Sequence, residues 1–241
     1  MLSFYKKQIA SWAWYDMPSV TSTNDVIKSV DIKDMPVVIS AINQTGGRGR
    51  RGRKWQSIDG NLYFTFSMEI PATDLSRYVC MVGLSLVKTI RALSATADVR
   101  IKWPNDVYLS GKKLCGILIE NIKDNVWAIG IGVNITGSPE IKDMPYQATS
   151  LKENGIISER TIFLEQYLEQ FQTDVAQYKN KGFTFIKEEW LQYALNLGQK
   201  VTIKNDTDVK TGVFLTLDEN GYLILKMKDK EERIIAGDLF I

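Results

Sequence analysis

Asn61-Leu-Tyr-Phe-Thr-Phe-Ser-Met-Glu-Ile70 is the stretch that decides the fold class of this chain. Its apolar and polar residues alternate, which is typical of a strand with one face on a core. From Asp74 the apolar spacing lengthens, and an amphipathic stripe from Leu75 to Leu93 predicts a long helix. The two patterns together indicate an α+β protein in which a sheet packs against helices.

Hydrophobic spacing and turn residues place the other elements on both sides of this stretch. Upstream, Ser22 is a good cap for a short helix that reaches Val30, and residues 37–39 form a β-branched strand. Downstream, we expect strands at 99–103, 114–122 and 126–133, an irregular connection at 136–158, and helices at 164–178 and 183–195.

The pattern of apolar and turn residues changes at Gly198, and from there on it is that of five short strands. Asn220-Gly221 lies between two of them and is a strong hairpin signal. The strands are expected at 200–204, 211–217, 222–227, 233–235 and 239–241. We therefore predict two domains, a main domain over 1–196 and a small β-barrel over 197–241.

Composition excludes several kinds of catalytic site. The 241 residues include no histidine, so a Ser-His-Asp or Cys-His arrangement and a metal site with histidine ligands are impossible within this chain. The two cysteines, Cys80 and Cys115, are too few for a four-cysteine zinc site. A net charge of +2 gives no reason to expect a surface that coats nucleic acid or membrane.

The cysteines and the apolar runs also bear on where in the cell the protein is located. Both cysteines lie in apolar stretches, which favours buried free thiols in a reducing cytoplasm over a disulfide. The chain opens without a basic-then-apolar leader, and no run of about 18 apolar residues occurs. We expect a cytoplasmic protein that does not span a membrane.

The positive charge is concentrated in one loop, Gly46-Gly-Arg-Gly-Arg-Arg-Gly-Arg-Lys-Trp55, called the arginine loop below. Its five basic side chains leave 25 basic against 28 acidic residues elsewhere, a net charge of −3. Three interpretations stay open: a solvated mobile loop, a nucleic-acid contact, or a loop that closes over a polyanionic small molecule. The spacing fits neither the P-loop pattern nor a strand–GxGxxG–helix unit.

Two further features favour a bound anion on a sheet. Lys102 alternates with Ile101 and Trp103 and so faces away from the core; if that face is covered, its ammonium needs an anionic partner. Along Val126–Asn134 the face opposite the isoleucines is bare because it carries Gly130 and Gly132. Glycines at alternate strand positions indicate that something lies flat on that face, a ligand or a packed helix.

Five motifs occur in the order and roughly the spacing known for one enzyme family. They are S-T-N at 22–24, Q-x-x-G-R-G-R-R-G-R-K-W at 44–55, K-W-P-N-D at 102–106, K-L-C-G-I-L-I-E at 113–120 and I-G-I-G-V-N at 129–134. With these residues the chain resembles the biotin–protein ligases. The resemblance implies a class II synthetase-like mixed sheet with helices over 1–196 and an SH3-like barrel over 197–241. Because the chain has no room for an N-terminal winged helix, it points to the monofunctional form.

The resemblance also implies the reaction. ATP, with Mg²⁺ on its phosphates, would activate biotin as biotinoyl-5′-AMP, which a lysine of a biotin carboxyl carrier domain then attacks. The implied partners are therefore a carrier domain of a biotin-dependent carboxylase, with no DNA and no membrane. A monomer and a homodimer both stay open.

The family's roles transfer to this sequence as follows. Lys102 is the principal catalytic residue by this transfer, with Arg50 and Arg48 beside it. The residues implied to bind biotin are Ser22, Thr23, Asn24, Gln44, Gly47, Arg48, Gly49, Arg50, Lys102, Gly116, Gly130 and Gly132. Those implied to bind ATP or the adenylate are Arg50, Arg51, Arg53, Trp55, Lys102 and Asn134, and no metal ligand is assigned on the protein.

Two rival hypotheses remain. A ligase or transferase of lipoyl or octanoyl groups shares this kind of fold, but its members usually place a histidine in their basic motif, and this chain has none. A non-enzymatic nucleic-acid-binding protein could use the arginine loop, and Trp55 could then stack on a base or pack in the core.

Overall fold

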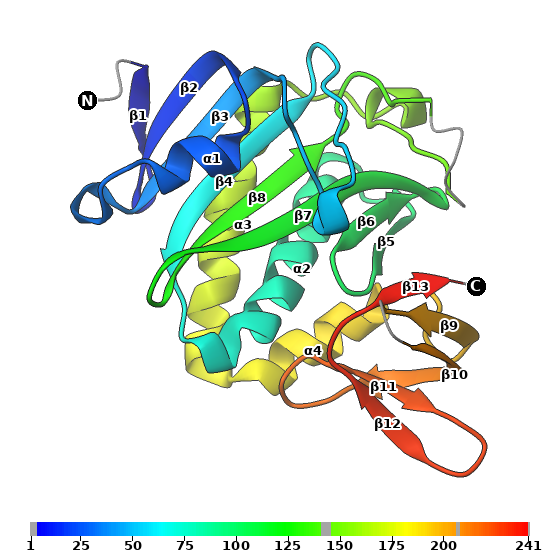
Figure 1. The fold of residues 1–241 in the computed structure, drawn as a ribbon. Helices are drawn as coiled ribbons and strands as arrows, with labels where there is room; N and C mark the ends of the chain where they lie inside the picture. The colour runs from blue at the N-terminus through cyan, green and yellow to red at the C-terminus, as the bar shows by residue number, and fades with distance from the viewer. Residues whose placement is uncertain (1–3, 141–145, 206–207, 241) are drawn as a thin grey trace.

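A computed structural model describes residues 4–140, 146–205 and 208–240 of the chain. These residues form an eight-stranded mixed sheet with helices, followed by a five-stranded antiparallel sheet (Figure 1). The predicted α+β class with a mixed sheet is confirmed. Within the described residues, no helix is long and apolar enough to cross a membrane.

The large sheet has the strand order β1-β2-β3-β4-β8-β7-β6-β5. Only the β2–β3 pair is parallel, and the other neighbours are antiparallel. In chain order its strands are β1 (Tyr5–Ile9), β2 (Trp12–Val20), β3 (Val37–Gln44), β4 (Leu62–Glu69), β5 (Val99–Lys102), β6 (Asp106–Leu109), β7 (Lys112–Lys123) and β8 (Val126–Val133). The helices are α1 (Thr23–Lys28), α2 (Leu75–Leu93), α3 (Arg160–Lys181) and α4 (Phe183–Gln192).

The two faces of the large sheet are covered differently, as the alternation in β4 and β8 requires. The isoleucine face of β8, with Ile129 and Ile131, shares the main core with α2 and α3. The opposite face carries α1, whose Ile27 packs with Ala128 in a smaller cluster. The arginine loop lies in front of this same face (Figure 1). The bare face predicted from the glycines is therefore the face that meets α1 and the loop.

Three strands of the large sheet are absent from the prediction. The first two, β1 and β2, form one edge of the sheet, and β6 follows Pro104 and Asn105 after only a short turn. Short strands next to proline carry little periodicity, and pairing with β7 is what orders β6. The predicted short helix exists as α1, but it ends at Lys28, before Val30, and α4 ends at Gln192, before residue 195.

The C-terminal sheet contains the five strands expected from the sequence. They are β9 (Lys200–Lys204), β10 (Val209–Leu217), β11 (Leu223–Lys226), β12 (Glu231–Ile234) and β13 (Asp238–Phe240), in the spatial order β12-β11-β10-β9-β13. This sheet lies beside the β5–β6 edge of the large sheet, with β13 next to β5 (Figure 1). The recorded pairings are those of an open sheet, so closure into an SH3-like barrel stays a prediction.

Candidate active site

The arginine loop is an ordered hairpin-like turn tied to the large sheet. Its two arms meet where Trp55 N donates to Gly47 O at 2.9 Å and Gly49 N donates to Arg53 O at 2.7 Å. A Cβ on Gly47 would lie 2.8 Å from Trp55 O, so only glycine permits this approach. Between the arms, Arg51 has a left-handed φ of 56°. The loop thus presents its cations from a defined backbone.

Beneath the loop lies a pocket whose floor is the bare face of β7 and β8. The indole of Trp55 rests on two of the glycines: an added Cβ on Gly116 would lie 2.7 Å from its ring, and one on Gly132 would lie 2.4 Å from it. A Cβ on Gly130 would lie 2.2 Å from Asn24 Oδ1. The three glycines are therefore required for the close approach of Trp55 and Asn24 to the sheet.

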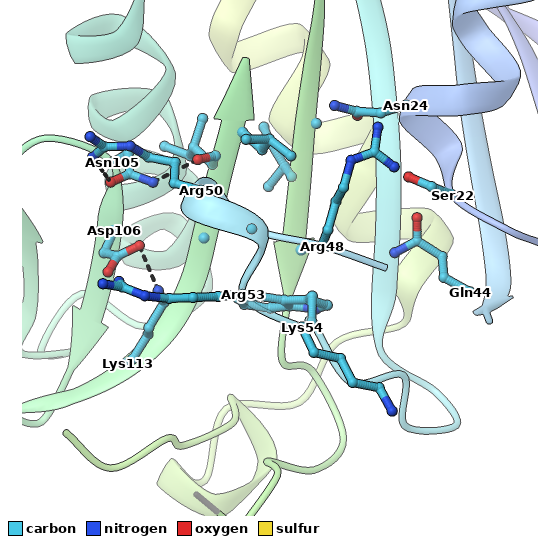
Figure 2. Close-up of a pocket in the computed structure, with 18 of the residues that line it drawn as sticks. Ser22, Asn24, Gln44, Arg48, Arg50, Arg53, Lys54, Asn105, Asp106 and Lys113 are labelled. Atoms are coloured by element: carbon cyan, nitrogen blue, oxygen red, sulfur yellow. Dashed lines mark hydrogen bonds and ion pairs between the residues drawn. The ribbon is translucent and has the colours of Figure 1, made fainter. Parts of the chain in front are cut away.

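One end of the pocket is lined by neutral hydrogen-bonding groups (Figure 2). Ser22 occupies the N-cap position of α1 but makes no side-chain cap hydrogen bond, so its hydroxyl is not used by the helix. Gln44 Oε1 accepts hydrogen bonds from Thr23 N at 2.8 Å and Thr23 Oγ1 at 3.2 Å. Thr65, buried on β4, donates to Asn24 Oδ1 at 2.6 Å. These bonds orient the lining amides and hydroxyls.

Glu120 on β7 anchors this neutral end to the arginine loop. Its carboxylate accepts from Asn24 Nδ2 at 2.7 Å and from Arg48 Nη2 at 3.0 Å, and Lys28 Nζ lies 3.2 Å away. Burial alone would raise the pKa of Glu120, but the Asn24 hydrogen bond and the two cations outweigh burial and lower it. Arg48 also pairs with Asp25 through two hydrogen bonds of 2.7 and 3.0 Å. Its guanidinium is therefore already shared between two carboxylates.

The other end of the pocket is cationic (Figure 2). Lys113 Nζ lies 2.7 Å from Asp106 Oδ1 and 5.7 Å from the centre of the Trp55 ring. Arg50 Nη1 donates to Asn105 Oδ1 at 3.0 Å and to Gly237 O at 3.4 Å. Burial lowers the pKa of Arg50, and the nearby Arg51 and Arg53 add to this, although a guanidinium stays charged near neutral pH. An anion at this end would meet the Lys113 ammonium, which is paired with Asp106, and the Arg50 guanidinium, which donates to neutral oxygens.

Comparison with known proteins identifies the family. The family model for biotin/lipoate A/B protein ligases matches residues 17–135, and the model for the biotin protein ligase C-terminal domain matches residues 197–241. A biotin–[acetyl-CoA-carboxylase] ligase of Paracoccus denitrificans is 33% identical over 216 residues, which cover 84% of this chain and 89% of that protein. The chain belongs to the biotin protein ligase family.

Two further comparisons bear on fold and length. The structure of a biotin protein ligase from Aquifex aeolicus in complex with biotin and ATP matches with a TM-score of 0.84 and 28% identity, covering 94% of this chain and 97% of that one. The bifunctional ligase/repressor BirA of Bacillus spizizenii is 31% identical over 84% of this chain. The matched region spans 65% of the length of that relative.

Most of the residues predicted for this family member do meet in one pocket. Those that line it are Ser22, Thr23, Asn24, Gln44, Arg48, Gly49, Arg50, Arg53, Trp55, Gly116, Gly130 and Gly132. Of the others, Gly47 shapes the loop, and Arg51 points to Asp238 in the C-terminal sheet, with Nη1 at 3.2 Å from Oδ2. Asn134 is buried; it donates to Thr149 O at 3.0 Å and accepts from Asn61 at 3.3 Å. Its predicted contact with adenine has no support from these partners.

Lys102 is also placed differently from the prediction. It is not among the pocket-lining residues; its ammonium lies 5.4 Å from the centre of the Tyr108 ring and 5.8 Å from that of Phe240, at the junction with the C-terminal sheet. Burial lowers the pKa of Lys102. The lysines that line the pocket are Lys54 of the arginine loop and Lys113 of β7.

A β-bulge explains why sequence reasoning missed Lys113. Strict alternation puts Lys113 and Gly116 on opposite faces of β7, because they are three residues apart. In the structure Val107 pairs with Cys115 and Tyr108 with Lys113, so Leu114 is an extra residue. The bulge turns Lys113 onto the face of Gly116. The signal available in the sequence was the K-L-C-G motif itself, which was quoted for the resemblance without a role for its lysine.

Proposed function

We propose that this protein is an ATP-dependent ligase that activates biotin as biotinoyl-5′-AMP and transfers it to a lysine of a carrier domain. The observation that carries the proposal is the polarity of the pocket. The Ser22 end has uncharged hydrogen-bonding groups and an Arg48 whose charge is balanced by Asp25 and Glu120, whereas the Lys113 end has an excess of cations. A ureido head needs neutral donors and acceptors, whereas a carboxylate beside a triphosphate needs cations. The glycine floor with Trp55 suits the apolar chain that joins the two groups of biotin.

In the first step, a carboxylate oxygen of biotin attacks the α-phosphorus of ATP, and the bond to the β-phosphate breaks to release pyrophosphate. The main obstacle is repulsion between like charges, roughly 4 kcal/mol for two unit charges about 4 Å apart at an effective dielectric near 20. Lys113 and Arg50 line the end where these charges would meet. We therefore propose Lys113 as a cation that bridges carboxylate and α-phosphate. The same role for Lys102, implied by the resemblance, stays a prediction, because Lys102 lies close enough to Asp106, Lys113, Asp238 and Arg53 to interact with their charges.

In the second step, a neutral lysine amine of the carrier attacks the acyl carbon of the mixed anhydride, an amide forms and AMP leaves. Until then the anhydride must be kept from water. Arg48 and Arg50 lie at the two ends of the pocket and belong to the loop above it, so the loop can cover the adenylate along its length (Figure 2). Neither step requires a histidine or an enzyme nucleophile.

Mg²⁺ is expected to enter on the phosphates of ATP, where it would neutralise charge on the leaving pyrophosphate. The donor set of the chain fits this route. The carboxylates nearest the cationic end are engaged by basic side chains, Asp106 by Lys113 and Asp238 by Arg51 and Arg53. Within the described ranges, no group of three acidic or cysteine side chains is spaced to hold a metal ion.

The partner proposed is a biotin carboxyl carrier domain of a biotin-dependent carboxylase. The Paracoccus relative named as a biotin–[acetyl-CoA-carboxylase] ligase supports this class of acceptor. We also propose a division into domains 1–196 and 197–241, which the C-terminal family match beginning at residue 197 supports. A cytoplasmic location is favoured by the two cysteines, which are both free and buried.

The test is pyrophosphate release from ATP and Mg²⁺ by the purified protein, with biotin, lipoate and octanoate offered separately. We expect release with biotin alone. Release with lipoate or octanoate instead would support the sister activity, which the family description includes. No release with any of the three acids by folded protein would contradict the proposal, and oligonucleotide binding at several salt concentrations would then test the nucleic-acid hypothesis.

A further inference from the structure

The C-terminal sheet contributes a carboxylate to the arginine loop. Asp238 opens β13, where it pairs with Lys204 of β9, and its side chain is 14% exposed. It accepts from Arg51 Nη1 at 3.2 Å and from Arg53 Nη2 in a shorter contact. The neighbouring Gly237 offers its carbonyl to Arg50. Two consecutive residues at the start of β13, Gly237 just before it and Asp238 within it, therefore contact three arginines of the loop.

These contacts divide the four arginines of the loop into three groups. Arg48 is held by Asp25 and Glu120 of the main body, whereas Arg51 and Arg53 are held by Asp238. Arg50, between them, donates to neutral oxygens in its recorded hydrogen bonds. Arg48 is thus anchored on one side of Arg50, and Arg51 and Arg53 are anchored on the other. This leaves the charge of Arg50 directed at the pocket.

We propose that Asp238 is a positioning residue that holds the arginine loop in its substrate-ready form from the C-terminal sheet. Five cations within seven residues repel one another, and Arg51 adopts a left-handed backbone conformation that an arginine rarely takes. A carboxylate shared by Arg51 and Arg53 offsets both costs. The inference rests on the proposed function for its kinetic consequence, since Arg50 is to meet the phosphates of ATP.

The kinetic test compares Asp238→Asn, which removes the charge at constant size, with Asp238→Glu, which keeps it. Glu232→Gln is the matched control, because Glu232 forms ion pairs within the same sheet, with Lys210 and Lys230. We expect Asp238→Asn to raise the KM for MgATP about tenfold, as for a lost charged hydrogen bond. In Asp238→Asn the KM for biotin and the melting temperature should change little. The control Glu232→Gln should keep wild-type values of all three quantities, and the KM for MgATP of Asp238→Glu should lie nearer to that of the wild type.

An unchanged or lower KM for MgATP in Asp238→Asn would overturn the proposal. The carboxylate would then either have no effect on ATP binding or compete with ATP for the arginines. If Asp238→Glu raised the KM for MgATP as much as Asp238→Asn does, the proposed role of the charge of Asp238 would be wrong. A general loss of stability would appear as an equal change in all kinetic constants together with a lower melting temperature, and would likewise count against positioning.

A second test needs neither substrate nor activity. Trypsin cleaves after arginine and lysine, so the rate at which the ligand-free protein is cut within residues 48–54 reports how firmly the loop is held. Asp238→Asn should be cut there faster than wild type, and Glu232→Gln should not. Equal rates for all three proteins would overturn the proposal even if biotin-dependent pyrophosphate release were confirmed. If that release failed instead, the proteolysis result would still decide whether Asp238 holds the loop.

Discussion

The ammonium of Lys113 lies 2.7 Å from Oδ1 of Asp106, with the two side chains only 15% and 18% exposed. The strands β6 and β7 bring the pair together through the bulge at Leu114. Lys113 is thus held near the pocket floor by a partner that a more strongly charged anion can replace. This relationship supports the proposed role of Lys113 and leads to the first prediction.

Lys113→Ala is expected to slow biotin-dependent pyrophosphate release by a factor of about 10²–10³, the usual effect of losing a group that stabilises transition-state charge. Lys102→Ala is the comparison, and its rate should fall by less than about tenfold. Both proteins should keep the wild-type fold by circular dichroism. If Lys102→Ala shows the larger loss, the assignment implied by the sequence resemblance is right and the assignment from the pocket is wrong.

Gly132→Ala is expected to weaken biotin binding, because the added Cβ would lie 2.4 Å from the Trp55 ring and force the indole off the floor. Such overpacking typically costs about 1–3 kcal/mol, so the KM for biotin should rise about tenfold or more. Gly137→Ala is the matched control, since its nearest heavy atom is 3.5 Å away, at Ile58. Normal biotin binding by Gly132→Ala would show that Trp55 is free to move without loss of the pocket.

Arg50→Gly is expected to release biotinoyl-5′-AMP into solution, because the loop would lose the guanidinium directed at the adenylate. Chromatography of the free adenylate, together with labelling of an unrelated lysine-rich protein, measures the leak. Lys54→Ala removes another loop cation, whose ammonium points away from Arg50 and Lys113 (Figure 2), and should leak less. Retention of the adenylate by Arg50→Gly at the wild-type level would refute this role.

Glu120 predicts an acid dependence of stability. Its folded-state pKa is lowered, so it stabilises the fold at pH values above its unfolded pKa, and this contribution is lost as pH falls through the folded pKa. The difference in free energy of unfolding between wild type and Glu120→Gln should therefore be largest near neutral pH and shrink below about pH 4.5. Chemical denaturation at several pH values measures it, with the exposed Glu188→Gln as a control. A difference that is constant with pH would contradict the assigned network.

The strands and helices with strong periodicity were predictable, and the weakly patterned ones were not. The alternation over 61–70 became β4, and the stripe from Leu75 to Leu93 became α2 with those bounds. In contrast, β1, β2 and β6 are defined mainly by their pairing partners. Their strand conformation depends on neighbours that are far away in the sequence, which a local pattern does not contain.

The candidate site divides in the same way. The arginine loop and the three floor glycines could be found from residue types, because clustered cations and bare strand faces are unusual in any context. The position of Lys113 on the same face as Gly116 depends on one extra residue in β7, which no periodicity reveals. The contact of Asp238 with Arg51 and Arg53 joins segments 185 or more residues apart.

The amino-acid sequence by itself determined the fold class, the absence of histidine chemistry and the family motifs. These follow from composition and short-range pattern, which are properties of the chain before it folds. Only the tertiary structure decided that Lys113 lines the pocket, where the indole of Trp55 rests, and that the C-terminal sheet supplies a carboxylate to the loop. Each of these depends on strand register or on docking between distant segments, where a shift of one residue exchanges the two faces of a strand.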